Sequence, residues 1–181
     1  MDEKIALEVK DLRKYFPVKK GFFKRTVGYV KAVDGVSFHI GAGETFGLVG
    51  ESGCGKTTVG KLVMRLHEAD AGEIRLFGKD ITHLRERDLR KERRNFQIVF
   101  QDPYGSLDPT KTVASILSEP LLKYKALPRG EINHRVESLL DMVGLNADDA
   151  NKYPHEFSGG QRQRVAVARA IALQPKLIVC D

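Results

Sequence analysis

The stretch "GESGCGKT", residues 50–57, constrains the fold of this chain more than any other feature. The apolar run TFGLV (45–49) precedes it, and apolar residues at helical spacing follow it: Val59, Leu62, Val63 and Leu66. The pattern G-x-x-x-x-G-K-[ST] between a strand and a helix is that of a phosphate-binding loop. We therefore predict an α/β fold, with a strand over 45–49 covered on both faces and a helix after the loop.

The chemistry of this stretch suits a nucleoside triphosphate. Glycines let the backbone curl so that its N–H groups face phosphate oxygens. Lys56 supplies a charge, Thr57 a hydroxyl for Mg²⁺, and the helix N-terminus a partial positive charge. The alternative is a glycine-rich turn that happens to carry a lysine. The predicted binding residues are Gly50, Glu51, Ser52, Gly53, Cys54, Gly55, Lys56, Thr57 and Thr58.

Strand and helix patterns divide the rest of the chain. Alternation over 5–9 and 30–40 predicts an antiparallel sheet near the N-terminus, 73–80 reads as a strand that leads into a glycine turn, and 96–100 reads as a further strand. Helical spacing runs from 113 to 143, with Gly144 as a C-cap, and again over 165–172, before a last strand at 177–181. We predict a single domain with a β subdomain and phosphate-loop core (about 1–100), a helical subdomain (about 102–160) and a final helix and strand (161–181).

Charge and composition narrow the class of protein. Thirty Lys and Arg against 24 Asp and Glu give a net charge of +6, which suits an anionic ligand, a nucleic acid or a membrane surface. The loop 19–25 is densely basic and reads as a solvated hairpin tip, or as a contact to lipid headgroups or a partner subunit. No apolar run reaches the roughly 18 residues that cross a bilayer. The start of the chain is too charged for a signal peptide, so we expect a cytoplasmic chain, in which the two cysteines, Cys54 and Cys180, are reduced thiols.

A second anion-directed motif begins at Phe157 with "FSGGQRQR". A serine and two glycines that open a helix favour a bound anion, because backbone N–H groups point outward there. The stretch resembles the LSGGQ signature of ATP-binding cassette (ABC) proteins, with Phe in place of the first Leu. Gly50–Thr57 resembles the Walker A loop, "FQDP" (100–103) the Q-loop and "LIVCD" (177–181) Walker B. The chain is identified as a member of the ABC ATPases.

Longer stretches, "IVFQDPYGSLDP" and "YPHEFSGGQRQR", are similar to ATPase subunits of oligopeptide and dipeptide importers. Relatives that import nickel, glutathione or other solutes share much of them. The resemblance implies a P-loop NTPase core with an N-terminal antiparallel β subdomain and a helical signature subdomain. It implies a subunit that hydrolyses ATP to energise an importer on the cytoplasmic side of the membrane, with permease subunits and, indirectly, an extracellular solute-binding protein as partners.

The resemblance also assigns roles to single residues. ATP and Mg²⁺ would lie between two ATPase subunits of a homo- or heterodimer, with Ser158, Gly159, Gly160 and Gln161 acting in trans on the γ-phosphate. Gln101 would reach Mg²⁺ or the attacking water, and Asp181 would hold Mg²⁺ through water. Tyr15 or Phe16 would stack on adenine, with core packing as the role of the other ring.

In the family, a catalytic Glu follows the Walker B acid, with a switch His and further strands beyond it, and these 181 residues contain none of them. We therefore expect a truncated ABC ATPase, with its C-terminal strands missing, that binds Mg-ATP but hydrolyses it poorly. The reason is that general-base catalysis contributes roughly 10²- to 10⁴-fold.

Two other functions stay open at this point. A soluble ABC-type ATPase acting on nucleic acid would suit the charge of +6. However, only 56 residues (102–157) separate Gln101 from Ser158, which leaves no room for a coiled-coil arm or a zinc insertion, so no nucleic acid is expected. The other possibility is a nucleotide-binding module without turnover.

Overall fold

The computed structural model describes residues 5–21 and 25–181, without the side chains of residues 103 and 104. The chain forms two compact units, residues 1–90 and 91–181. Both strands and helices are present, with an antiparallel sheet at the N-terminus and a helical unit after it, which confirms the predicted α/β class. The three-part division predicted from the sequence remains a proposal.

The first unit is built on a four-stranded antiparallel sheet of order β2-β1-β3-β4. Its strands are β1 (Ile5–Lys20), β2 (Arg25–Gly41), β3 (Ala71–Leu76) and β4 (Lys79–Asp80). Val9 stands at the centre, paired with Phe38 on one side and with Ile74 on the other. Because the apolar side chains at 7, 9 and 12 are buried, the sheet has a covered face that can carry a helix.

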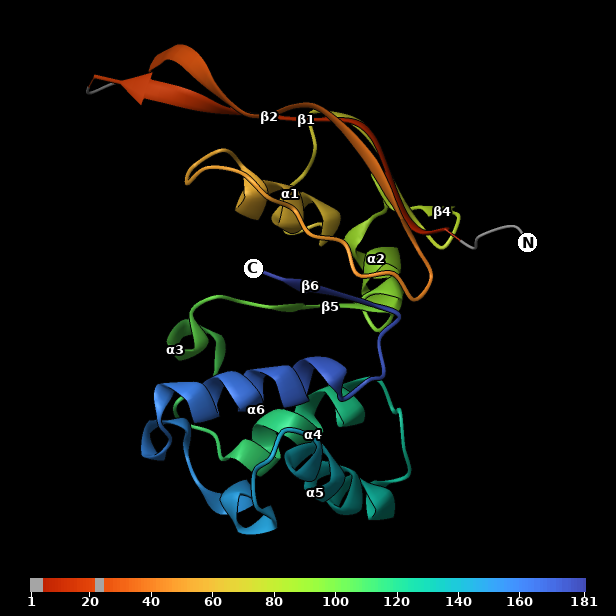
Figure 1. The fold of residues 1–181 in the computed structure, drawn as a ribbon, viewed down its shortest axis with the longest axis vertical. Helices are drawn as coiled ribbons and strands as arrows, with labels where there is room; N and C mark the ends of the chain where they lie inside the picture. Colours follow the sequence, from red (N-terminus) through yellow and green to blue (C-terminus); the bar gives the residue numbers. More distant parts are fainter. Residues whose placement is uncertain (1–4, 22–24) are drawn as a thin grey trace. The chain divides into compact units, whose positions relative to one another are not determined.

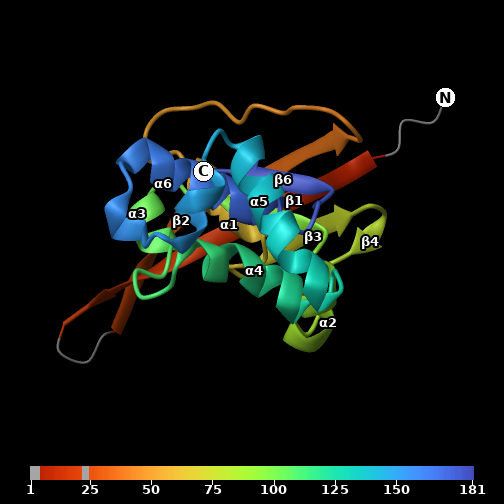
Figure 2. The same cartoon turned by 90° about the horizontal axis from the view of Figure 1, so that it is seen from below.

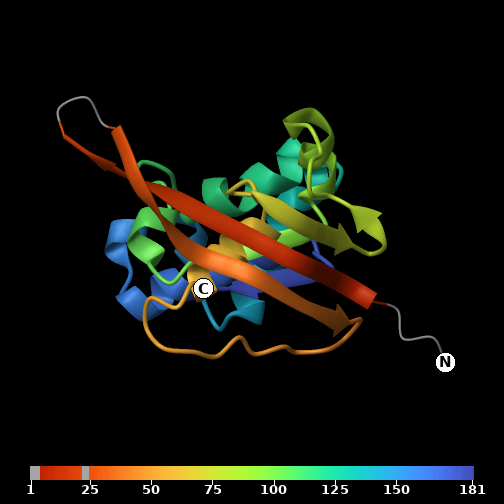
Figure 3. The ribbon, with the colours of Figure 1, turned by 90° about the horizontal axis from the view of Figure 1, so that it is seen from above.

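The described residues of this unit also form the helices α1 (Lys56–Val63) and α2 (Glu86–Glu92). Figures 1 and 3 show α1 lying beneath β1 and β2. It buries Val59, Leu62 and Val63, the residues whose spacing predicted a helix. The sheet therefore holds in place the helix that follows the glycine-rich loop.

The strand predicted over 45–49 is absent, and this prediction is wrong. Residues 44–50 carry no regular structure, Phe46 and Leu48 are each 41% exposed, and Val49 is 93% exposed. A strand exists only when its N–H and C=O groups pair with a neighbour, and no strand of the described residues pairs with this segment. The apolar pattern indicated burial, but it could not show whether a pairing partner is available.

The second unit combines a parallel strand pair with a helical core. Strands β5 (Phe96–Val99) and β6 (Leu177–Cys180) pair in parallel, and α6 (Gly159–Ile171) packs against β5. Helices α4 (Val113–Lys123) and α5 (Ile132–Met142) lie on the other side of α6, as Figures 1 and 2 show. The remaining elements are the short helix α3 (Pro103–Ser106) and three 3₁₀ turns, η1 (Arg129–Glu131), η2 (Ala147–Asn151) and η3 (Pro154–Glu156).

The core of this unit follows the periodicity of the sequence. Leu117, Leu139, Leu140, Val165 and Ala168 are completely buried where the three helices meet. Helix α5 ends at Met142 with Val143 as its C-cap, and the predicted cap, Gly144, is the next residue, with a φ of +70° and an N–H that donates to the carbonyl of Asp141 over 2.9 Å. None of the helices in the described part of the chain is long and apolar enough to cross a membrane.

Candidate nucleotide-binding site

The glycine-rich loop is fixed at its end by close packing on β2. Gly55 caps α1 with a φ of 100°, and no side chain caps the helix. A Cβ atom built on Gly55 would lie 2.1 Å from the carbonyl oxygen of Ala32, far inside contact distance. Only glycine fits here, because both the left-handed backbone and the close approach exclude a side chain.

Lys56 closes the loop on itself. Its Nζ donates to the carbonyl oxygens of Gly50 and Glu51 over 2.7 and 2.6 Å and lies 3.7 Å from the Sγ of Cys54. The first backbone N–H groups of α1 have no acceptor one turn earlier within the helix. An ammonium and a helix N-terminus beside one exposed loop are the donors that a triphosphate needs, so the residues present fit ATP.

The remaining loop residues lie where such a ligand would approach. Glu51, Ser52, Gly53 and Cys54 are exposed, and Gly53 takes a φ of +81°. Thr57 and Thr58 lie in the first turn of α1, the former exposed and the latter half-buried. The structure therefore brings all nine predicted loop residues to one end of α1.

The two aromatic candidates for adenine lie side by side on β1, and both are half-buried. The Tyr15 hydroxyl donates to Asp34 over 2.5 Å, and this bond lowers the pKa of Asp34 and raises that of Tyr15. The Phe16 ring meets His67 edge-on, with the ring centres 5.8 Å apart. Each ring thus has a packing partner within the first unit, and the choice between them stays a proposal.

Gln101 and Asp181 lie at the same edge of the strand pair in the second unit. The register pairs Val99 with Cys180, and the N–H of Asp181 donates to the carbonyl of Val99 over 3.0 Å. Asp181 therefore directly follows the carboxyl end of β6, and Gln101 lies two residues after Val99, the last residue of the adjacent parallel strand β5. A carboxylate and an amide oxygen are ligands that Mg²⁺ accepts, so this pair fits the metal.

The signature stretch begins α6 with a complete capping box. Ser158 Oγ accepts from the N–H of Gln161 over 3.3 Å, and Gln161 Oε1 accepts from the N–H of Ser158 over 2.9 Å. Gly159 and Gly160 are exposed, and a Cβ at either would meet nothing within 4 Å. A partner could therefore approach their backbone closely.

The residue before this cap anchors it from below. Phe157 is only 4% exposed and packs into the helical core, and its carbonyl accepts two bonds, of 2.9 and 2.7 Å, from Arg162. A large apolar residue is thus required at this position for packing, which explains why Phe can stand where the signature has Leu.

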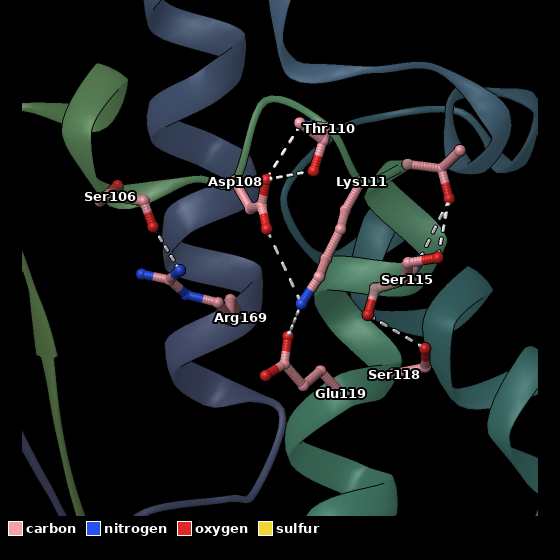
Figure 4. Close-up of polar contacts among 9 residues, drawn as sticks. Ser106, Asp108, Thr110, Lys111, Ser115, Ser118, Glu119 and Arg169 are labelled. Atoms are coloured by element: carbon pink, nitrogen blue, oxygen red, sulfur yellow. Dashed lines mark hydrogen bonds and ion pairs between the residues drawn. The ribbon is translucent and has the colours of Figure 1, made fainter.

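Sequence reasoning missed the contacts that hold the segment after Gln101, residues 102–112 (Figure 4). From α6, Arg169 donates to the carbonyl of Ser106, and burial lowers the pKa of Arg169. From α4, Glu119 pairs with Lys111 over 2.7 Å. No local pattern could predict an Arg169–Ser106 contact across 63 positions, although Asp108 and Thr110 form a readable turn.

A groove of about 310 Å³ opens beside this segment in the second unit. Phe100, Glu119, Tyr124 and Arg169 are among its lining residues. Because Phe100 directly precedes Gln101, a group that enters the groove would lie against the residue next to Gln101.

Comparison with known proteins agrees with this geometry. The ABC transporter family model matches residues 33–181. The oligopeptide transport ATP-binding protein AppF of Bacillus subtilis (strain 168) is 52% identical over 99% of this chain and 55% of its own length. The glutathione import ATP-binding protein GsiA of Pectobacterium atrosepticum is 48% identical over 97% of the chain and 28% of its own length.

Solved structures give the same assignment. The ATP-binding cassette MJ0796, in a dimeric post-hydrolysis state bound to ADP and Pi, matches with a TM-score of 0.85 and 31% identity. The match covers 97% of this chain and 73% of that one. The chain spans about half the length of AppF. Because the family model covers most of the sequence and the first relative is more than half identical, the chain belongs to the ABC transporter family.

Proposed function

We propose that this chain is the ATP-binding and ATP-hydrolysing subunit of an importer for oligopeptides or dipeptides. The observation that carries the proposal is the N-terminus of α1, which is capped by Gly55. There, Lys56 and the N-terminus of the helix lie beside one exposed loop. The 52% identity to a protein named for oligopeptide transport supports the class of solute. The similarity to a glutathione import protein leaves small peptides as the broader class.

Within this proposal the residues have distinct roles. Backbone N–H groups of the loop and Lys56 bind the phosphates, Thr57, Gln101 and Asp181 hold Mg²⁺, and Tyr15 or Phe16 stacks on adenine. Mg²⁺, when bound, neutralises charge on the β- and γ-phosphates. Gln101 orients water at that edge.

The signature stretch of a second subunit would complete the site. Ser158, Gly159, Gly160 and Gln161 form an exposed helix start, and a second anion-directed surface on the same chain suits a ligand gripped across a dimer. The dimeric ADP-bound relative supports this arrangement. We infer a homo- or heterodimer in which ATP joins the two subunits.

Transport requires permease subunits, and the groove beside Phe100 is our candidate for their contact. A permease segment in this groove would displace the backbone next to Gln101 and so report its state to the nucleotide site. The subunit would then lie at the cytoplasmic face of the membrane, and a solute-binding protein would act through the permease.

A chimera tests transport. The 181 residues would replace their counterpart in AppF, because they span only about half of its length. We expect restored uptake of an oligopeptide in a Bacillus subtilis strain lacking AppF, and none with Lys56→Met. Loss of uptake in a chimera that binds ATP and assembles would contradict the proposed solute class.

Nucleotide binding is measured separately on the 181-residue chain. We expect calorimetry to show Mg-ATP binding that Lys56→Met weakens. Stimulation of the chimera's ATPase by DNA or RNA, without stimulation by a permease, would favour the nucleic-acid function instead.

A further inference from the structure

The outer half of the β1–β2 hairpin is a two-stranded ribbon, and apart from the adenine candidate Phe16 at its base none of its residues has an assigned role. The pairing of β1 with β3 ends at Arg13 opposite Ala71, and the described residues of β1 beyond Tyr15 pair with β2 alone. The register continues to Lys20 opposite Arg25. Figures 1 and 3 show this end extending past α1. We call the described residues 16–20 and 25–30 the ribbon.

The ribbon exposes more apolar surface than a solvated hairpin needs. Val27, Tyr29 and Val30 are 59, 66 and 55% exposed. A two-stranded hairpin with no covering layer is marginally stable in water. A second phase that covers these side chains would therefore order the ribbon as well as bury apolar area.

These apolar side chains occupy both sides of the ribbon. Tyr29 is paired with Pro17 and Val30 with Phe16, and consecutive residues of a strand point to opposite faces. A flat protein surface laid on one side would leave the other side in water. Insertion of the end of the ribbon into a deformable layer, such as the interfacial region of a lipid bilayer, would cover both faces of the ribbon.

Charge identifies that layer. Lys19, Lys20 and Arg25 lie at the exposed end of the ribbon, and residues 15–31 contain no Asp or Glu. Lys31, at the base, is already paired with Asp34. Cations beside exposed valines and a tyrosine match an anionic lipid surface, where the cations meet headgroups and the apolar side chains reach the acyl boundary.

We propose that the ribbon docks on the anionic lipid surface of the membrane. This goes beyond the proposed function, because it gives the chain a lipid contact that does not depend on a permease. Nucleic acid would also attract the cations, but its backbone offers no apolar partner for Val27 and Val30.

A tryptophan reporter tests the proposal, because the chain contains no Trp. Tyr29→Trp in the 181-residue chain should show a blue-shifted emission with vesicles of phosphatidylglycerol and phosphatidylcholine, and none with phosphatidylcholine alone. Salt at about 0.5 M should weaken the shift, because it screens exposed charges. Tyr153→Trp, at an exposed position in the second unit, is the control and should not shift.

Charge and apolar variants separate the two contributions. Neutralising Lys19, Lys20 and Arg25 to Gln should lower the vesicle partition coefficient by a factor on the order of 10². The same change at Arg85, Arg87 and Arg90, which are exposed around α2, should lower it far less. Val30→Thr keeps a β-branched side chain and should lower it several-fold.

Three results would overturn the proposal: no shift with anionic vesicles at low salt, an equal loss in both charge variants, or an equal shift with single-stranded DNA at the same concentration. Mg-ATP binding measured on every variant reports folding. The Trp signal does not require ATP. Failure of the parent chain to bind nucleotide would therefore count against the proposed function, and the vesicle experiment would still test the lipid contact.

Discussion

The two helices that begin beside glycines, α1 and α6, differ in how the N–H groups of their first turn are capped. Helix α1 begins at a left-handed Gly55 with no side-chain cap, and Lys56 turns back onto carbonyls of its own loop. Helix α6 begins at Ser158 with both bonds of a capping box in place. The N-terminus of α1 thus has no side-chain cap, and a bound ligand would supply acceptors for its N–H groups. The N-terminus of α6 is already capped by side chains, so a ligand would contact it only at its exposed surface.

The largest effect should come from Gly55→Ala in the phosphate loop. The added Cβ would overlap the carbonyl of Ala32 at 2.1 Å, so β2 or α1 must move. We expect a loss of about 3 kcal/mol or more in the free energy of unfolding, together with loss of nucleotide binding. Denaturant titration measures the former.

Gly53→Ala is the matched control for this loop. Gly53 also has a positive φ, of 81°, but a Cβ there would meet nothing within 4 Å. Its cost should stay at about 1 to 2 kcal/mol. Equal losses for the two variants would show that packing on Ala32 is not what fixes the loop.

Lys56→Met should affect binding more than stability. Its ammonium donates to two carbonyls of an exposed loop, so its removal costs little folding energy. A charge-assisted bond to phosphate is worth about 1.5 to 3 kcal/mol, so the Kd for Mg-ATP should rise roughly 10- to 100-fold. Lys61→Met in the last turn of α1 is the control and should leave the Kd unchanged. Calorimetry with both variants measures the two Kd values.

In the signature stretch, a substitution should affect stability directly, in contrast to Lys56→Met. Ser158→Ala should lower the free energy of unfolding by about 1 kcal/mol through loss of the cap. Ser158→Asn and Ser158→Asp should both restore the cap. Only Asp adds a negative charge toward phosphate, so it should abolish ATP-dependent dimerisation, followed by light scattering. Dimerisation of the Asp variant equal to that of Asn would argue against a phosphate contact.

The smallest effect concerns the segment that leads into the signature. The buried carboxylate of Asp149 accepts from Lys152 over 2.7 Å and from the N–H of Asn146 over 3.0 Å, and these bonds lower its pKa. Its stabilising contribution is therefore complete above the unfolded pKa of about 3.9 and is lost as the pH falls through the lower folded value.

Asp149→Asn should cost about 1 kcal/mol at pH 7, and the difference from the parent chain should shrink below pH 4. Thermal unfolding at a series of pH values measures it. Asp148→Asn, the exposed neighbour, should show no such trend. A pH-independent difference for Asp149→Asn would mean that the ion pair is not the cause.

Local patterns predicted local structure well. The spacing of Val113, Ile116, Leu117 and Leu121 marked α4, and the predicted cap Gly144 lies one residue beyond the C-cap of α5, Val143. The capping box was also readable, since Ser158-x-x-Gln161 is its sequence pattern. The strand over 45–49 failed because strands depend on a partner elsewhere in the chain.

Long-range contacts were not predictable for the same reason. Nothing near residue 55 indicates that the carbonyl of Ala32 makes glycine obligatory there. Nothing near residue 169 indicates that its guanidinium holds Ser106. The sequence located the candidate residues, and tertiary packing determined which of them are rigidly held.

The pairing of Val99 with Cys180 has a consequence for how this sequence can change in evolution. The position of Gln101 is set by its distance of two residues from Val99, which is paired. Deletion of one residue between 96 and 101 would therefore place Asp102 where Gln101 now lies. It would also turn the core-facing side chains of the strand to its other face. Substitutions can be absorbed along this strand, but changes of length cannot. Alignments of homologues should therefore contain amino-acid differences across 96–101 and no gaps.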